Sequence, residues 1–281
     1  MDFPVCDCHV HVFDPKRFAY VTTRRFTPGE ATVAQLKSNL EKVGISNVVL
    51  VQPSVYGEDN SCLLSALKEL GSTARGVAVV SKHTSSEEMV ALQEAGVRGA
   101  RLNLVVDSFE DTGLALLKLI EIEQHIPANW HVQLHVSQPV LCALANHISQ
   151  SNRTYVLDHM GLPDIASGHK ANNWLQLLEL MKSDRLYVKV SAPYLYSRIL
   201  NVYTDLAPFV QSILDARSDR VLWGSNWPHT QGTNRNKDIE LESIETFRNI
   251  DNHAWLYASK KWFGKNALKV MSENSKSLYG Y

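Results

Sequence analysis

Four histidines stand where they could act together on one substrate. His9 and His11 form a His-x-His pair near the N-terminus, and His135 and His159 each follow a short apolar run further along the chain. A neutral imidazole can bind a metal ion, and its ring nitrogens can polarise a carbonyl group or carry a proton. These residue types therefore predict either a metal site or a site that polarises a substrate carbonyl, provided that the fold gathers the four rings.

Short β-branched runs alternate with longer helical patterns along the chain, which is typical of repeated β/α units around a parallel sheet. We predict eight strands, over residues 5–11, 47–52, 76–80, 99–103, 132–135, 155–158, 186–191 and 221–224. We predict helices over residues 33–43, 62–70, 87–95, 114–125, 140–150, 174–182, 206–216 and 239–249. An extra C-terminal helix is expected over residues 254–270, followed by a Ser-rich polar end.

An open, doubly wound sheet is the rival fold for such an alternation. It usually has a Gly-rich turn after an early strand, and no G-x-G-x-x-G follows the first strand here. Polar residues instead close nearly every predicted strand, as expected of a closed barrel whose carboxyl ends converge on one site. No linker or low-complexity segment divides the chain. We therefore predict an α/β fold, a (β/α)8 TIM barrel, as one domain over residues 1–281.

The first strand should present its histidines to the barrel mouth. Side chains alternate along a strand, so the odd positions from Asp7 to His11 share one face and Cys6, Cys8 and Val10 share the other. We expect the second, more apolar set to face the helices. That arrangement leaves the two imidazoles side by side inside the barrel.

Composition indicates a small-molecule partner. The 281 residues carry 28 Lys plus Arg against 29 Asp plus Glu, so the net charge of -1 gives no bias toward nucleic acid or an anionic membrane. No apolar run approaches the ~20 residues of a membrane helix, and no signal peptide is visible. Four cysteines in a chain of this length do not make a disulfide framework, so we expect a cytoplasmic protein with reduced thiols.

Seven motifs occur in a fixed order along almost the whole chain, in residues 7–14, 51–60, 96–103, 131–135, 157–161, 188–194 and 223–229. Together they resemble the amidohydrolase superfamily of the amidohydrolase-2 type. The resemblance is strongest to the branch of 2-pyrone-4,6-dicarboxylate lactonases and related lactone hydrolases. It implies a hydrolase that opens the ring ester of a small, carboxylated lactone or pyrone by water attack, with His9, His11, His159 and Asn226 as catalytic residues.

One departure from the family pattern affects the expected mechanism. The superfamily carries an aspartate at the tip of its eighth strand, as metal ligand and general base, and this chain has Asn226 there. An amide cannot take a proton from water at ordinary pH. The resemblance therefore implies either that no cofactor is required or that one divalent metal, zinc first, binds to His9, His11 and His159, with His135 as an additional ligand. A non-hydrolytic lyase (a decarboxylase, dehydratase or cyclising enzyme) and a silent binding protein stay open as alternatives.

The remaining candidates are side chains that could bind a carboxylated substrate. The guanidinium fork matches carboxylate geometry, which makes Arg101 the first of them. Some of these residues also have a purely structural explanation. The residues near position 54 could form a plain turn, the arginine at position 198 could be a solvated loop residue, and the histidine at position 229 could pack against aromatic neighbours. The predicted substrate-binding residues are Ser54, Tyr56, Arg101, Asn103, His135, Tyr194, Arg198 and His229.

Overall fold

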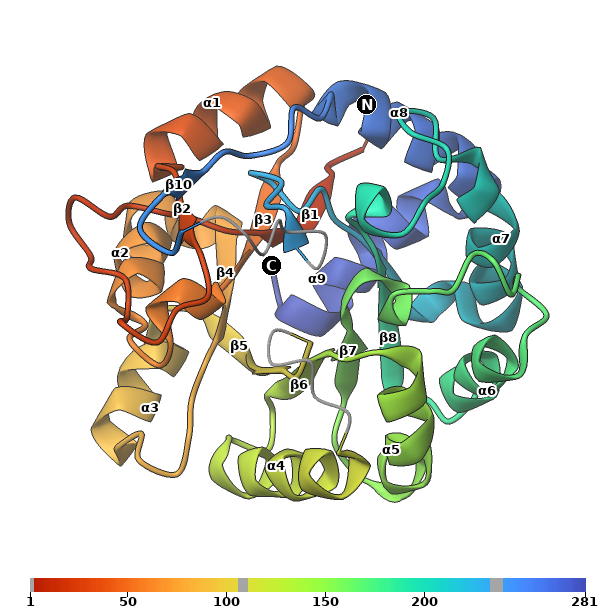
Figure 1. The fold of residues 1–281 in the computed structure, drawn as a ribbon, viewed down its shortest axis with the longest axis horizontal. Coiled ribbons are helices and arrows are strands. Elements are labelled where there is room, and N and C mark those ends of the chain that lie inside the picture. The colour runs from red at the N-terminus through yellow and green to blue at the C-terminus, as the bar shows by residue number, and fades with distance from the viewer. Residues whose placement is uncertain (1–2, 106–110, 233–239) are drawn as a thin grey trace.

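The computed structural model describes residues 3–105, 111–232 and 240–281. Eight parallel strands form one sheet in the order β1-β3-β4-β5-β6-β7-β8-β9. Their bounds are Cys6–Val10, Asn47–Val51, Ala74–Ala78, Val97–Asn103, His131–His135, Tyr155–Leu157, Leu186–Val190 and Val221–Trp223. Figure 1 shows these strands as a central ring with the helices outside. The predicted (β/α)8 barrel is confirmed.

The ring closes where β9 returns to β1. The amide N–H of His11 donates to the carbonyl oxygen of Trp227 at 2.8 Å, and the N–H of Asn226 donates to the carbonyl oxygen of His9 at 2.9 Å. A Cβ atom on Gly224 would lie 2.8 Å from the Cβ of His9, so only glycine allows this approach. The seam therefore fixes the first strand and the tip of the last one against each other.

Nine α-helices lie in the described part of the chain. Their bounds are α1 Val33–Val43, α2 Ser61–Leu70, α3 Ser86–Glu94, α4 Thr112–His125, α5 Gln138–Gln150, α6 Asn172–Met181, α7 Ala207–Arg217, α8 Asn252–Phe263 and α9 Asn274–Tyr279. Capping residues explain two of the starts, because Thr32 with Gln35 and Ser85 with Glu88 form capping boxes. No helix in these described ranges combines the length and the apolar character needed to cross a membrane.

The helix predicted over residues 239–249 is wrong for residues 240–249, and Ile239 lies outside the described residues. The segment contains a short strand, β10 (Ile244–Glu245), which pairs in parallel with β2 (Thr27–Pro28). Its backbone bonds to neighbouring loops, since Gly29 N–H donates to Glu245 and Arg248 N–H donates to His229. Ile244 is 70% exposed, so the apolar residues that suggested a helix do not share one buried face in the observed structure.

The extra C-terminal helix is present, but the helical structure extends further along the chain than predicted. After α8 the chain continues through a π-helical turn (Lys269–Glu273) into α9. Tyr279 is fully buried, its ring centroid lies 5.4 Å from that of His131 at the start of β6, and the Tyr281 hydroxyl donates to Val48. The polar C-terminal segment thus covers the N-terminal end of the barrel, and Figure 1 places the C-terminus near the centre of the ring.

A β-bulge corrects the expected faces of β1. Asp7 pairs with Val48 and Val10 pairs with Leu50, so β1 carries one extra residue between these pairs. Cys6 and Cys8 consequently pack inside the barrel with inward side chains of other strands, whereas Val10 joins the core beneath the helices. The prediction that the two cysteines face the helices was therefore wrong. The bulge inserts one residue before the histidines and so changes which side chains of β1 point into the barrel.

Candidate active site

The carboxyl ends of the strands bring the four predicted imidazoles together. The Nε2 atoms of His9 and His11 lie 3.3 Å apart. The ring centroid of His159 lies 4.7 Å from that of His9 and 5.2 Å from that of His135. All four side chains are buried. They form one cluster inside the barrel mouth, because closure of the barrel brings the ends of their strands together.

The outer nitrogens of the His-x-His pair are held by acceptors. His11 Nδ1 lies 2.7 Å from the carbonyl oxygen of Val51, which can only accept, so this nitrogen carries the proton. His9 Nδ1 lies 3.2 Å from Asp158 Oδ1, although the two atoms are not aligned for a hydrogen bond. Such partners fix the tautomer and the orientation of an imidazole. Both Nε2 atoms therefore point at a shared position inside the mouth.

Asp158 is the centre of this network, and the sequence prediction missed its role. Besides His9, its carboxylate lies 3.2 Å from Arg101 Nε and 3.7 Å from Lys189 Nζ. Burial by itself raises the pKa of Asp158, but His9, Lys189 and Arg101 outweigh it and hold the pKa well below the usual range. Its place directly before His159 at the end of β7 was the available signal.

Arg101 and Lys189 are tied in turn to β6. Arg101 Nη2 lies 3.3 Å from His135 Nδ1, and Lys189 Nζ donates to the side-chain oxygen of Gln133 at 2.6 Å. Burial lowers the pKa of Lys189, while the nearby carboxylate of Asp158 opposes that shift. The two cations are thus arranged around one fully buried carboxylate.

Burial keeps the imidazoles neutral at pH 7. It lowers the pKa of His11 to about 4, with the charge of Arg101 adding to the effect. The pKa values of His9, His135 and His159 lie well below 6.5, again chiefly because of burial. Each ring therefore offers one donor and one acceptor nitrogen.

Asn226 is held in one orientation by Tyr194. Its side-chain N–H donates to the Tyr194 hydroxyl at 2.7 Å, while Asn226 Oδ1 is buried with no hydrogen-bond partner among the described residues. The ring of Tyr194 contacts His229 edge to face, with centroids 5.6 Å apart, and the Arg248 guanidinium lies 5.4 Å from the Tyr194 centroid. Asn226 Oδ1 therefore offers a hydrogen-bond acceptor at the position where the family pattern has a carboxylate.

Three of the predicted residues adopt left-handed backbone conformations. The φ angles are +53° for His159, +65° for Asn226 and +74° for His229. A non-glycine residue in this region costs about 1–3 kcal/mol, and such residues concentrate at functional sites. At His159 the geometry is supported by a 2.8 Å contact between its Nδ1 and the Ser191 hydroxyl.

The other predicted residues lie further from the cluster or are bound elsewhere. The Tyr56 hydroxyl accepts from the backbone N–H of Asp14 at 2.8 Å, and Ser54 is half-buried on the same short helical turn. Arg198 is exposed in the loop after β8. Asn103 ends β5 and is paired in register with His135. Of these four, Asn103 is placed beside the cluster.

Asp7 is a second buried carboxylate that the prediction did not use. Its Oδ1 accepts from the backbone N–H of Ser225 at 2.8 Å and from that of His9 at 3.2 Å. Burial raises its pKa to about 6, against the opposing effect of the bonds from Ser225 and His9. Asp7 thus joins the β9 tip to β1 and orients the backbone of the catalytic strand.

A divalent metal fits part of this donor set. Two nitrogen ligands at about 2.0–2.1 Å on a tetrahedral zinc ion lie roughly as far apart as the 3.3 Å between His9 Nε2 and His11 Nε2. Ligand atoms of His9, Asp158 and His159 also lie within 4.8 Å of one another. Asp158 already faces two cations, so the imidazoles are the donors that fit such an ion.

Comparison with known proteins agrees with this geometry. Residues 6–271 match the amidohydrolase family. The chain is 35% identical over 234 residues to a 2-pyrone-4,6-dicarboxylate hydrolase of Comamonas testosteroni, covering 79% of this chain and 76% of that protein. It is 26% identical to a 4-sulfomuconolactone hydrolase of Hydrogenophaga intermedia, over 80% of this chain and 74% of that protein.

A solved structure shows the same fold. The crystal structure of a probable 2-pyrone-4,6-dicarboxylic acid hydrolase from Acinetobacter baumannii, with citric acid bound, superposes with a TM-score of 0.78 at 28% identity. The match covers 99% of this chain and 100% of that one. The similarity therefore extends over the whole barrel and not over one motif.

Proposed function

Since this chain belongs to the amidohydrolase family, we propose that it opens the ring ester of a small, carboxylated lactone or pyrone by water attack. The observation that carries the proposal is the convergence of three neutral imidazoles, His9, His11 and His159, beside the buried cation Arg101. Similarity to named lactone hydrolases supports the choice of a ring ester. Four free cysteines, three of them buried, support a cytoplasmic enzyme.

The imidazoles polarise the scissile carbonyl in this proposal. The Nε2 atoms of His9 and His11 point at one shared position, and in the neutral rings both carry a lone pair because each Nδ1 faces an acceptor. One proton, taken up from solvent as the substrate binds, therefore lies on one of these Nε2 atoms, donates a hydrogen bond to the developing oxyanion and returns to solvent after the ring opens. Hydrogen bonds aimed at that oxygen lower the barrier because they strengthen in the tetrahedral intermediate. Asp158 keeps His9 in the required orientation.

Arg101 binds a substrate carboxylate. Its contacts with Asp158 and His135 use Nε and Nη2, and no described residue makes a hydrogen bond with the other terminal nitrogen, which is the one that would contact a ligand in the mouth. A substrate carboxylate that approaches the guanidinium exchanges its contacts with water for a charge-assisted hydrogen bond. Asn103 and His135, at the ends of the neighbouring strands, contribute further polar contacts.

Water attack proceeds without a carboxylate on the last strand. Asn226 Oδ1 accepts a hydrogen bond from the water and orients it toward the carbonyl carbon. When His159 Nδ1 donates to Ser191, its other nitrogen takes the proton of the attacking water and returns it to the ring oxygen as the C–O bond breaks. Because burial lowers the pKa of His159, it is a weaker base than a solvent-exposed imidazole.

If a divalent ion is resident, His9, His11 and His159 would hold it, and it would act as a Lewis acid on the carbonyl. Elemental analysis together with hydrolysis assays before and after chelation tests its part in the reaction. Undiminished activity in demonstrably metal-free protein would remove the ion from the scheme.

One observation favours a second function. Asn226 provides no general base, so a reaction that needs no activated water, such as a decarboxylation, dehydration or cyclisation, is the alternative on the same scaffold. Arg101 and the imidazoles would then stabilise the charge left on the substrate.

The proposal is tested by assaying purified protein with a panel of carboxylated lactones and pyrones and with uncharged lactones of the same ring size. Proton release in a pH-stat and chromatography of the ring-opened acid measure the reaction. We expect ring opening, with kcat/KM at least about tenfold higher for carboxylated rings because of the charge-assisted bond to Arg101. Ring opening of no member of the panel would contradict the proposal.

A further inference from the structure

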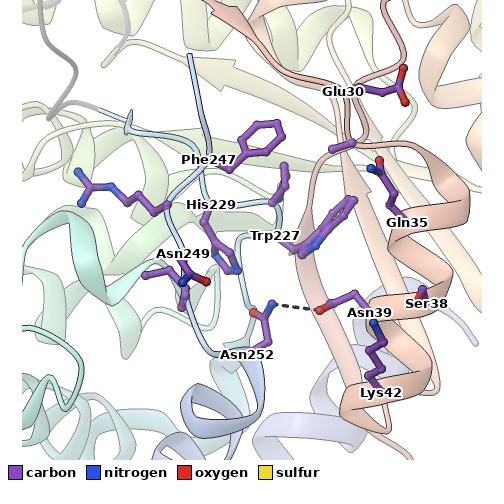
Figure 2. Close-up of a pocket in the computed structure, with 14 residues that line it drawn as sticks. Glu30, Gln35, Ser38, Asn39, Lys42, Trp227, His229, Phe247, Asn249 and Asn252 are labelled. Atoms are coloured by element: carbon purple, nitrogen blue, oxygen red, sulfur yellow. Dashed lines mark hydrogen bonds between the residues drawn. The ribbon is translucent and has the colours of Figure 1, made fainter. Parts of the chain in front are cut away.

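A second pocket lies beside the barrel seam, outside the histidine cluster. It is bounded by α1, by the loop after β9 and by residues 247–252 (Figure 2). Its volume is about 420 Å³, within the ~300–1,000 Å³ typical of small-molecule sites. None of the four clustered imidazoles lines it.

Buried polar atoms without partners gather at this pocket. His229 is 3% exposed; its ring interacts with the Asn252 side chain, but neither ring nitrogen makes an aligned hydrogen bond to a described residue. Asn252 donates to Asn39 at 3.1 Å, but this leaves Asn39 Nδ2 and Asn252 Oδ1 unpartnered and buried. Figure 2 shows His229, Asn39 and Asn252 around the same space. Buried polar atoms nearly always have hydrogen-bond partners, so a molecule bound in the pocket would supply the partners that these atoms lack.

The unpartnered atoms call for hydroxyl groups. Asn39 Nδ2 must donate, Asn252 Oδ1 must accept, and His229 needs one partner of each kind, whereas a hydroxyl both donates and accepts. A carboxylate could satisfy only the donors. Further uncharged polar side chains line the pocket, namely Gln35, Ser38 and Asn249.

The charged residues that line the pocket are one carboxylate, Glu30, and two cations, Lys42 and Arg248. Glu30 pairs with Lys16 at 2.7 Å. The Arg248 guanidinium lies 5.4 Å from the Tyr194 centroid, and its buried Nε, which has no hydrogen-bond partner among the described residues, is a further donor that a hydroxyl oxygen can satisfy. Lys42 is exposed on α1. The side chains of Trp227 and Phe247 supply apolar walls in Figure 2. We propose that this pocket binds a small, uncharged, polyhydroxylated molecule of the sugar or cyclitol class.

The pocket is linked to the candidate active site through one residue. The His229 ring lies between the pocket and Tyr194, whose hydroxyl holds the amide of Asn226. A ligand that bonds to His229 therefore contacts the packing partner of the residue that orients Asn226. The proposal does not depend on the reaction catalysed in the barrel mouth.

The test titrates the full chain with D-glucose and myo-inositol, with citrate as an anionic comparison, while NMR records the His229 imidazole signals. Millimolar Kd values are expected for ligands of this size, so titration to about 50 mM suffices. The variants Asn252→Leu and Asn39→Leu should each weaken polyol binding at least about tenfold. Asn146→Leu, an exposed position on α5, is the matched control and should leave binding unchanged.

Thermal unfolding of every variant shows that it is folded before binding is compared. If Asn252→Leu does not fold, Asn39→Leu and the imidazole signals of the unaltered protein carry the test. Unshifted His229 signals with both polyols, equal binding by the pocket and control variants, or preferential binding of citrate at this pocket would overturn the proposal. Ordered water that persists in a crystal soaked with glucose would do the same.

Discussion

Nδ1 of His9 and Oδ1 of Asp158 lie 3.2 Å apart, and both side chains are fully buried inside the barrel. This contact turns the free nitrogen of His9 toward His11 and joins the imidazole cluster to the two buried cations. The carboxylate therefore serves orientation, charge balance and the placement of Arg101 at once.

Asp158→Asn should lower both stability and activity. The substitution leaves Arg101 and Lys189 buried without their carboxylate, for which about 3–5 kcal/mol of unfolding free energy is expected to be lost. Release of His9 should lower kcat/KM at least about a hundredfold. Urea unfolding and initial rates at subdenaturing temperature measure the two effects. The exposed Asp164→Asn is the control, and equal behaviour of the two variants would contradict the role assigned to Asp158.

Asn226→Asp should increase ring hydrolysis. The new carboxylate would accept the proton of water, and a positioned general base is worth about 10²–10⁴ in rate. Burial beside Tyr194 should raise the pKa of the new carboxyl group, so the activity gained by the variant should appear with rising pH as this group loses its proton. Asn226→Ala provides the comparison, since it removes the amide without adding a base. No gain in kcat for Asn226→Asp at any pH would show that water activation is not the slow step.

Much of this site could be predicted, because its residues end strands. His9, His135 and His159 follow apolar runs, and closure of the barrel brings the ends of those runs together. The β1 bulge could not be predicted, since two-residue alternation gives no sign of an inserted residue. The role of Asp158 was hidden because it depends on Arg101 and Lys189 from other strands.

In the C-terminal region the sequence pattern was misleading. Residues 240–249 carry apolar residues at helical spacing, yet their backbone groups bond to Gly29 and His229. Tertiary contacts outweighed local pattern there. Tyr279 follows a Ser-rich stretch that indicates a solvated end, and its burial under the barrel depends on the ring that it covers.

Arg101→Lys should weaken substrate binding more than turnover. Lysine keeps the charge but loses the planar fork that contacts Asp158 and His135 together. We expect KM for a carboxylated lactone to rise about tenfold with a smaller change in kcat. An uncharged lactone is the internal control, because its KM should change little. A uniform fall in kcat for both substrates would point to a structural role alone.

His131 should make the protein less stable in acid. Burial lowers its pKa from 6.5 to about 3 in the folded state, so between these values only the unfolded chain takes up the proton. Stability therefore rises with pH in this window and falls as pH drops, by about 1.4 kcal/mol per pH unit for one proton. His131→Phe, which keeps an aromatic ring against Tyr279, should reduce that slope by one proton. Urea unfolding at several pH values measures the slope. Parallel slopes for His131→Phe and the unaltered protein would disprove the assignment.

The most direct measurement for the proposed reaction is single-turnover conversion of a carboxylated lactone in ¹⁸O-labelled water, followed by mass spectrometry of the acid. Water attack on the ring ester predicts one labelled oxygen in the new carboxylate of each product molecule. Product that forms at the enzymatic rate without the label would contradict the hydrolytic account and favour the lyase.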